Sequence, residues 1–427
     1  MPQEKKIKSF SAIGYIRAMN YAEALDFLYG NLPMYQNMGK TAFKKDLTNT
    51  IRLCEGMNNP QYAFKSVHVG GTNGKGSSSH MLASVLQEAG YKTGLYTSPH
   101  LKDFTERIRV NGQPISEENV IGFVEDHHTL IQEIEPSFFE MTVVMAFDYF
   151  RREKVDVAII EVGLGGRLDS TNVIIPEVAL ITNIGYDHMD MLGNTLELIA
   201  GEKAGIIKPQ VSVIIGTTQP ETQEVFSRTA RERNAPLTFA DQQDWNREAY
   251  PPDLKGNYQK QNLPGVLSTI KELQEQGWTV TDKNISKGLS QVVANTGLKG
   301  RWQTLSESPL TICDTGHNVN GVELIVEQLQ QLTYKRLFLV LGFVNDKNIA
   351  EILTLFPSDA QYIFCQSKVP RAMPLATLMT TAMEIGIEGV AVTDVNEALQ
   401  VARQQAGPND LIFVGGSTFV VAELEEL

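Results

Sequence analysis

The sequence has 427 residues, a length that favours two or three domains over one, and its 42% hydrophobic and 20% charged residues are typical of a globular protein. Its 37 basic and 50 acidic residues give a net charge of −13, which argues against a broadly basic nucleic-acid surface. Neither a secretory signal nor a membrane-length apolar run is visible, and Cys54, Cys313 and Cys365 form no disulfide framework. We therefore expect a cytoplasmic protein that binds neither nucleic acid nor membrane, and take a monomer as the default.

Short apolar runs alternate with amphipathic stretches through the first part of the chain. The first run, around Val67 and Val69, leads through a glycine-rich turn into a predicted helix over residues 77–89, which Gly90 would cap. Further strands are predicted at residues 93–97, 155–162, 178–184 and 211–215. Continuous apolar strands alternating with helices indicate a parallel sheet covered on both faces.

The alternation restarts in the last third of the chain. A polar segment over residues 240–260 is predicted to be surface or linker, and a helix follows over 263–276. We place the domain boundary within residues 296–300, which gives a first domain of 1–297 and a second of 298–427. Strands of the second domain are predicted at 310–314, 336–341, 361–365, 389–393 and 410–414. The predicted fold is α/β, a P-loop-type, mostly parallel sheet domain followed by a smaller Rossmann-like domain.

The glycine-rich turn is predicted to bind phosphate. Glycines let successive backbone N–H groups surround an anion, and the following helix directs its dipole at it. Lys75 would reach the outer phosphates, and a hydroxyl of Ser77 or Ser78 would face a metal. The usual P-loop pattern has Gly where Val69 stands and Ser or Thr where Gly76 stands, so a ligand-free turn is the alternative. The predicted nucleotide contacts are Thr72, Asn73, Gly74, Lys75, Gly76 and Ser77.

Polar side chains follow two of the predicted strands. Glu161 ends one strand, and Asp187 and His188 come after the next. Because ligands of open α/β sheets bind at the carboxyl ends of strands, Glu161 is a candidate Mg²⁺ ligand. On local pattern alone, His188 is equally well an ordinary polar turn residue, Asp187 a structural one, Ser98 part of a proline turn and Lys203 a solvated helix lysine.

Eight motifs occur in order over most of the chain: Gly71-Thr72-Asn73-Gly74-Lys75-Gly76-Ser77, Thr97-Ser98-Pro99-His100, Glu161-Val162-Gly163-Leu164-Gly165-Gly166-Arg167-Leu168-Asp169, Asp187-His188, Glu202-Lys203-Ala204-Gly205-Ile206, Gly300-Arg301-Trp302, Asp314-Thr315-Gly316-His317-Asn318 and Gly415-Gly416-Ser417. Together they resemble the folylpolyglutamate synthase/dihydrofolate synthase family, a branch of the Mur-ligase-like ATP-dependent amide ligases. The family usually has Ala where Gly316 stands, which leaves the geometry of that loop open.

The resemblance implies roles that the local patterns do not. It makes Ser98, Glu161 and His188 ligands of Mg²⁺, with two metal sites, and gives Lys75, Lys203 and His188 catalytic roles. Lys203 aligns with a lysine that the family carries as a carbamate. Residues expected to grip ATP, beyond the phosphate loop, are Asn262, Arg301, Asp314 and His317.

The resemblance also implies a pocket for a pterin. Its residues would be Ser137, Phe138, Phe139, Glu140, Leu168, Asp169 and Ser170. Aromatic rings suit stacking on a flat pterin, but Phe138 and Phe139 fit a core equally well. Residues 40–43, Lys40-Thr41-Ala42-Phe43, are a weaker candidate for closing this pocket.

The activity that the resemblance implies is ATP-dependent ligation of L-glutamate to a pterin carboxylate, 7,8-dihydropteroate or a reduced folate, through an acyl phosphate in folate biosynthesis. Three alternatives stay open at this point: a folylpolyglutamate synthase without dihydrofolate synthase activity, a peptidoglycan-precursor ligase, and a P-loop ATPase that is not a ligase. Gly76 and the Glu161 segment argue against the peptidoglycan ligase.

Overall fold

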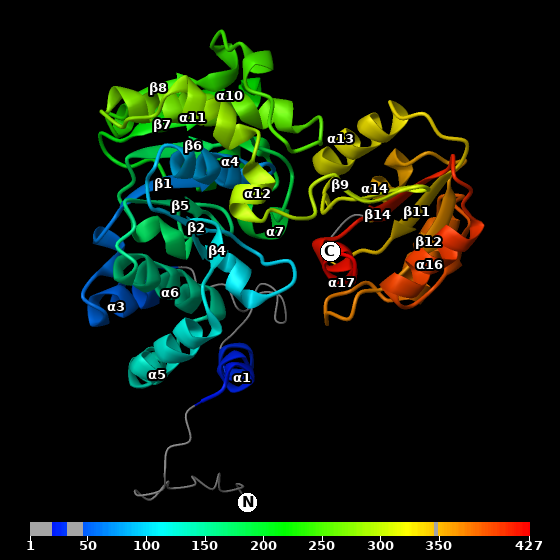
Figure 1. The fold of residues 1–427 in the computed structure, drawn as a ribbon, viewed down its shortest axis with the longest axis horizontal. Coiled ribbons are helices and arrows are strands. Elements are labelled where there is room, and N and C mark those ends of the chain that lie inside the picture. The colour runs from blue at the N-terminus through cyan, green and yellow to red at the C-terminus, as the bar shows by residue number, and fades with distance from the viewer. Residues whose placement is uncertain (1–18, 32–45, 346–348) are drawn as a thin grey trace, which may run out of the picture.

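The computed structural model describes residues 19–31, 46–345 and 349–427, which form two α/β lobes (Figure 1). The first lobe contains an eight-stranded sheet in the order β4 (Gln113–Pro114), β3 (Ile108–Val110), β2 (Thr93–Tyr96), β5 (Val157–Glu161), β1 (Lys65–Gly70), β6 (Val178–Ile181), β7 (Ser212–Ile215) and β8 (Leu237–Phe239). Neighbouring strands from β2 to β8 are parallel, whereas β3 and β4 pair antiparallel at one edge.

Both faces of this sheet are buried, as the continuous apolar strands predict. Val157 and Ile159 of β5 face one core, whereas Ala158 and Ile160 face another. One face is covered by α4 (Lys75–Glu88), α10 (Gln259–Glu275), α11 (Asp282–Leu289) and α12 (Val292–Thr296). The other carries α1 (Tyr21–Asn31), α3 (Thr48–Gly56), α5 (Glu117–Ile134), α6 (Phe138–Arg152), α7 (Met189–Leu192), α8 (Leu196–Ala204) and α9 (Pro220–Glu232).

Short 3-10 helices connect several of these elements. They are η2 (Pro60–Tyr62), η3 (Phe104–Arg107), η4 (Ser170–Val173), η5 (Ala240–Gln242) and η6 (Arg247–Ala249). Two of them position residues of the site described below, because η3 leads into β3 and η4 follows the glycine-rich turn after β5.

The second lobe contains a six-stranded sheet in the order β13 (Gly389–Ala391), β12 (Gln361–Phe364), β11 (Leu337–Leu341), β14 (Leu411–Gly415), β10 (Leu310–Cys313) and β9 (Gln303–Glu307). Only β9 is antiparallel to its neighbour. Its helices are α13 (Val319–Gln330), α14 (Ile349–Leu355) and α15 (Leu375–Glu384) on one face and α16 (Val395–Gln405) and α17 (Thr418–Glu423) on the other. The two α/β lobes confirm the predicted fold class.

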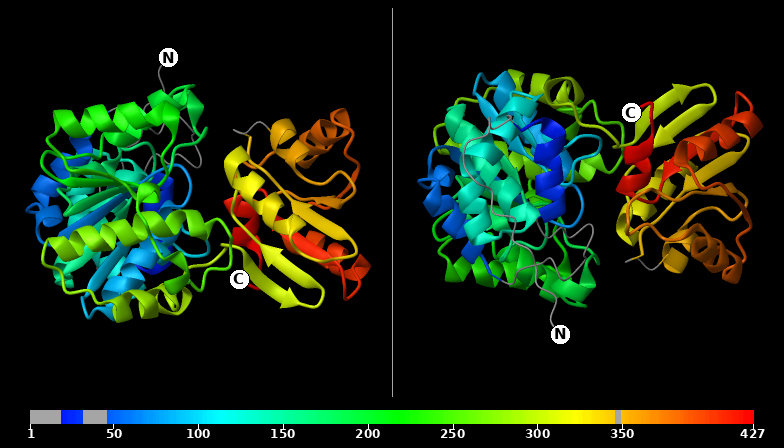
Figure 2. Two further views of the ribbon diagram at one scale, coloured as in Figure 1. Left: turned by 90° about the horizontal axis from the view of Figure 1, so that it is seen from above. Right: turned by 90° about the horizontal axis from the view of Figure 1, so that it is seen from below.

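The lobes face each other through α13 and α17 of the second lobe (Figures 1 and 2). Lys102 Nζ, in the first lobe, donates to the carbonyl of Leu424, and the side chains of Asn257 and Gln331 are joined by a 2.9 Å hydrogen bond. The chain passes from one lobe to the other after α12 and before β9. The predicted boundary between residues 297 and 298 falls in this connection. The exact position of the boundary stays a prediction.

The helix after the glycine-rich turn differs from the expected amphipathic one. It begins at Lys75, and its polar residues Ser77, Ser78 and Ser79 are as buried as its apolar ones. The reason is that α10, α11 and α12 pack against the side of α4 that would otherwise face solvent. Gly90 follows the helix with φ of +92°, the left-handed conformation that its predicted capping role requires.

Four strands, β3, β4, β8 and β9, have no counterpart among the predicted ones. They are short or polar and lie toward the edges of their sheets, where no continuous apolar run is needed. The three cysteines are buried and unpaired. No helix among the described residues is long and apolar enough to cross a membrane.

Candidate active site

A cavity of about 400 Å³ lies between the two lobes and collects residues from both. The predicted nucleotide, metal, catalytic and substrate residues line it, with the exception of Ser78 and of residues 40–43, which lie outside the described residues. The first lobe contributes the phosphate loop and the carboxyl ends of β5 and β6, and the second contributes the connection around Arg301 and the turn after β10. Residues separated by more than 200 positions in the chain therefore meet in one place.

The phosphate loop has the backbone that its glycines allow. Gly71 has a φ of +135° and Gly74, which precedes α4, has a φ of +83°. A Cβ at Gly71 would lie 1.9 Å from Thr182 Oγ1, and one at Gly74 would lie 2.1 Å from Asn262 Oδ1. The Lys75 ammonium donates to the carbonyls of Gly71 and Thr72 at 3.1 Å. The loop is therefore held tightly between β6 and α10, with its lysine folded over it.

Gly76, the departure from the usual P-loop pattern, faces the acidic edge. A Cβ at this position would lie 3.5 Å from Glu161 Oε1 and 3.7 Å from Arg301 Nη2. A Ser or Thr side chain would therefore occupy space beside the Glu161 carboxylate. Ser77 Oγ lines the cavity and accepts from Gln259 Nε2 at 3.1 Å, whereas Ser78 lies outside the lining. Of the two predicted hydroxyls, Ser77 is the one that faces the site.

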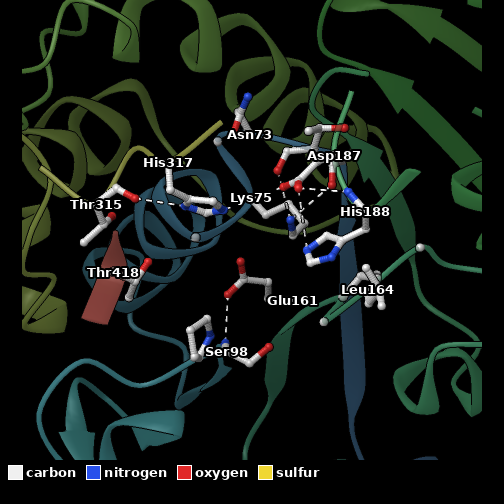
Figure 3. Close-up of a pocket in the computed structure, with 18 of the residues that line it drawn as sticks. Asn73, Lys75, Ser98, Glu161, Leu164, Asp187, His188, Thr315, His317 and Thr418 are labelled. Carbon is white, nitrogen blue, oxygen red and sulfur yellow. Dashed lines mark hydrogen bonds and ion pairs between the residues drawn. The ribbon is translucent and has the colours of Figure 1, made fainter. Parts of the chain in front are cut away.

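Glu161, Ser98 and His188 surround one space near Lys75 (Figure 3). Glu161 is 5% exposed and its Oε2 accepts from the backbone N–H of Ser98 at 3.1 Å. Burial raises the pKa of the Glu161 carboxyl, and Lys75 partly offsets this. His188 has a left-handed φ of +49° directly before α7, and its Nε2 lies 3.8 Å from Asp187 Oδ1.

This donor set fits a hard divalent cation. The Ser98 hydroxyl and the Glu161 carboxylate offer oxygen, and a cation would offset the burial of the carboxylate. The described residues include no group of three His, Cys, Asp or Glu side chains that could hold a metal by themselves. Mg²⁺ takes few protein ligands and completes its shell with water and phosphate oxygens, so one hydroxyl and one carboxylate are donors that suit it.

Lys203 is not the solvated lysine that its local sequence suggests. It is 4% exposed, and its Nζ donates to the carbonyl of Gly71 at 2.8 Å, the carbonyl that also accepts from Lys75. Burial and the charge of Lys75 lower the pKa of Lys203 to about 7. Two ammonium groups therefore approach one carbonyl oxygen, and the more deeply buried one readily loses its proton.

The second lobe holds Asp314 rigidly at the cavity. The Asp314 carboxylate is 3% exposed and accepts from Tyr258 Oη at 2.6 Å, from Trp302 N at 2.7 Å and from Gly316 N at 2.8 Å. Arg301 hydrogen-bonds to Thr315 Oγ1. At Gly316, a Cβ would lie 2.5 Å from Ile325 Cδ1, so the end of this α13 side chain would have to shift to admit the alanine that the family usually has here.

Amide side chains join the phosphate loop to the second lobe. Asn73 and Asn318 exchange two hydrogen bonds, of 3.2 and 3.0 Å, and Asn318 Nδ2 also donates to Asp187 Oδ2 at 3.3 Å. His317 Nδ1 contacts the carbonyl of Thr315, and its Nε2 lies 3.7 Å from the same Asp187 oxygen. Asn318 and Asp187 were not predicted to do this, although both stand in motifs that the resemblance uses. Tyr258 lies in the segment interpreted as linker, and no sequence signal marks it.

The predicted pterin residues form the far end of the cavity. Phe138 is 4% exposed and belongs to the core, whereas Phe139 is partly exposed and its ring lies against Gly163, where a Cβ would be 2.4 Å from Cζ. Ser137 and Glu140 form the capping box of α6. That pair therefore has a structural function whether or not it contacts a substrate.

Leu168, Asp169 and Ser170 follow the turn after β5. Asp169 is 3% exposed and accepts from Leu164 N at 2.8 Å and from both the backbone and the hydroxyl of Thr171. It fixes the turn that faces Phe139. The candidate residues Lys40, Thr41, Ala42 and Phe43 lie outside the described residues.

Comparison with known proteins agrees with this geometry. Residues 69–274 match the Mur ligase middle domain and residues 300–418 match the Mur ligase glutamate ligase domain. The dihydrofolate synthase/folylpolyglutamate synthase of Bacillus subtilis is 32% identical, over 95% of this chain and 98% of its own length. The Escherichia coli protein of the same name is 33% identical, over 84% and 85%.

Solved structures resemble the whole molecule. Escherichia coli FolC in complex with DHPP and ADP has a TM-score of 0.81 at 29% identity, covering 95% of this chain and 96% of that one. The Yersinia pestis bifunctional folylpolyglutamate synthase/dihydrofolate synthase with Mn, AMPPNP and L-glutamate bound has a TM-score of 0.82 at 29% identity, covering 95% and 97%. The predicted resemblance is confirmed: this chain belongs to the dihydrofolate synthase/folylpolyglutamate synthase family of Mur-type ligases.

Proposed function

We propose that this chain uses ATP to join L-glutamate to a pterin carboxylate, 7,8-dihydropteroate or a reduced folate, through an acyl phosphate. Family membership bears out the predicted class, an ATP-dependent amide ligase in folate metabolism. The observation that carries the proposal is the single cavity in which the phosphate loop, the acidic edge of the sheet and the second lobe meet. Relatives crystallised with ADP, DHPP and L-glutamate support the three substrates.

The proposed roles follow the positions of the residues around the cavity. Thr72 to Ser77 would surround the phosphates of ATP through their backbone N–H groups, and the second lobe would grip the nucleotide from the opposite side. The residues proposed for that grip are Asn262, Arg301, Asp314 and His317. Ser98, Glu161 and His188 would hold Mg²⁺, which when bound neutralises charge on the phosphates. A relative from Yersinia pestis was crystallised with Mn and AMPPNP.

The chemistry then needs positioning more than it needs a nucleophilic side chain. An oxygen of the acceptor carboxylate attacks the γ-phosphorus of ATP, and ADP leaves as the acyl phosphate forms. The amine of L-glutamate attacks the acyl carbon, and inorganic phosphate leaves with the formation of the amide. Lys75 stabilises charge on the phosphoryl oxygens during the first step. The aromatic end, with Ser137, Phe138, Phe139, Glu140, Leu168, Asp169 and Ser170, would hold the pterin.

We also propose that Lys203 is carboxylated in the working enzyme. Its burial and its low pKa supply a neutral amine near neutral pH. That amine adds to the carbon of CO₂, forming an N–C bond and releasing one proton, and leaves a carbamate anion. The charge of Lys75 lies next to it and would stabilise the anion. A negative group here would also suit a second cation near the phosphate loop.

An assay of ADP release tests the function directly. With Mg-ATP and L-glutamate, release should require 7,8-dihydropteroate or tetrahydrofolate, and the Lys75→Ala and Glu161→Ala variants should release none. Activity with tetrahydrofolate alone would identify a folylpolyglutamate synthase without the dihydrofolate synthase reaction. A relative from Lacticaseibacillus casei that is named a folylpolyglutamate synthase is 31% identical over 96% of this chain. ADP release without acceptor and glutamate would refute the ligase proposal in favour of a plain ATPase.

A further inference from the structure

Arg107 is a buried cation in the wall of the cavity that no predicted role uses. It ends η3, directly before β3, and its side chain lines the cavity at the aromatic end. It is only 3% exposed. Burying an arginine is costly unless an opposite charge or a set of acceptors compensates it, so the partners of this guanidinium decide what it does.

Those partners occupy one edge and one face of the guanidinium. Nε donates to His100 Nδ1 at 2.8 Å, and Cζ lies 5.2 Å from the centroid of the Phe138 ring. The Nε–H of arginine can only donate, so His100 Nδ1 is the acceptor of this hydrogen bond. The side chain is therefore fixed in position. Tyr96 also hydrogen-bonds to it, but a guanidinium has five N–H groups, so terminal donors, the part that recognises planar anions, remain for a ligand.

The described part of the chain gives Arg107 no ion-pair partner. Tyr96 hydrogen-bonds to Arg107, but a phenol is a neutral partner at neutral pH. Glu161 is the acidic group that influences Arg107, and it already faces Lys75 and the Ser98 backbone. The cavity wall therefore holds a positive charge that has no direct ion pair among the described residues.

We propose that Arg107 binds the carboxylate of the acceptor acid, the group that is to be phosphorylated. This inference rests on the proposed function. Arg107 lies between the Phe138 ring and the side chain of His100, and His100 is two residues after Ser98. Arg107 therefore stands where the aromatic end of the cavity meets the acidic edge. A flat acceptor lying along the aromatic end would bring its acid to this place.

A carboxylate is the ligand that this environment selects. It supplies the missing negative charge, and its two oxygens match the paired N–H groups of a guanidinium. A neutral carbonyl of the pterin would accept a hydrogen bond but leave the charge uncompensated. Held on one oxygen by Arg107, the carboxylate would keep its other oxygen for the γ-phosphorus. Arg107 would then be a catalytic residue, in contact with the reacting group.

The test is a binding cycle with two acceptors that differ only at the acid. Pteroic acid and its carboxamide are titrated by calorimetry into the wild-type protein and the Arg107→Met variant, all with Mg-ADP present. We expect the wild type to prefer the acid and the variant to lose about 10- to 100-fold of that preference, as for a buried charged hydrogen bond. Any contribution of the metal is common to both proteins and cancels.

Arg109 provides the matched control. It is also buried, stands two residues further along in β3, and lies outside the cavity lining, where its Nη1 donates to the Gly112 carbonyl. Arg109→Met should keep the preference for the acid, and Arg107→Lys should keep part of it through its charge. All three variants should bind ADP as the wild type does.

Several outcomes would overturn the inference. Equal loss of affinity for acid and amide in Arg107→Met would mean that Arg107 binds the pterin, and a loss of ADP affinity would mean that it binds phosphate. If the Arg107→Met variant does not fold, the wild type alone still tests the inference, because equal binding of the acid and the amide by the wild type would refute it. Wild-type protein that binds ADP but neither pteroyl compound would instead refute the proposed function.

Discussion

Replacing Gly74 by Ala tests whether the phosphate loop is as tightly fitted as its geometry implies. Ala at a φ of +83° costs about 1 kcal/mol through the left-handed backbone alone. Its Cβ would also lie 2.1 Å from Asn262 Oδ1, so Asn262 must move. That movement breaks the 2.8 Å bond from Asn262 Nδ2 to Gln259 Oε1, a buried contact worth about 1–3 kcal/mol when one partner is left unpaired.

Together, the strained backbone and the broken hydrogen bond should lower the free energy of unfolding by about 2–4 kcal/mol. Gly90→Ala is the matched control, because Gly90 follows the same helix with a φ of +92° and a Cβ there would meet nothing within 4 Å. It should lose about 1 kcal/mol only. Urea unfolding followed by circular dichroism measures both values, and calorimetry with ADP measures nucleotide affinity.

The two measurements separate the causes. Gly74→Ala should lose ADP affinity, because Asn262 and the loop backbone both line the cavity, whereas Gly90→Ala should bind ADP normally. Equal destabilisation of the two variants would show that no clash occurs at Gly74. Unchanged ADP affinity in Gly74→Ala would show that this loop is not the nucleotide site.

Four further predictions concern other parts of the cavity. In buffer free of CO₂, the free energy of unfolding of the wild type should rise from pH 7 to pH 10 more steeply than that of Lys203→Met. The reason is that the pKa of Lys203 is about 7 in the folded protein, against its ordinary value of 10.5, so the unfolded chain binds more protons over this range. With ¹³C-bicarbonate at pH 8, the wild type should show a carbamate carbon signal by NMR that Lys203→Met lacks; its absence from both would remove the carboxylation proposal. Asn318→Leu breaks two hydrogen bonds to Asn73 between the lobes, and it should raise KM for ATP several-fold with helical content unchanged. An unaltered KM would show that this contact does not help to hold the closed site. Phe139→Leu should weaken pteroate binding and leave ADP binding intact, since its ring lies at the far end of the cavity; equal losses for both ligands would place it in general packing.

Local sequence determines the first half of the site. Alternating apolar strands and helices predict a parallel sheet, and the carboxyl ends of such strands share one edge, which places Glu161, His188 and the loop around Lys75 together. This works because each of these residues ends or follows a strand of the same sheet. Asp314 and His317 also follow a strand, β10, but that strand belongs to the other lobe, and Arg301 follows α12 rather than a strand. Only the order of the motifs, through the resemblance, brought these three residues to the nucleotide site.

Tertiary structure decided what burial does to each polar residue. Lys203 has the local sequence of a solvated helix lysine and Arg107 has no sequence signal at all, yet both are buried, because helices and turns from distant parts of the chain cover them. The Asn73–Asn318 contact spans 245 positions and depends on how two lobes meet. The sequence therefore determined which chemical groups are available at this site, whereas packing determined their charge states and partners, since desolvation depends on every element that surrounds a side chain.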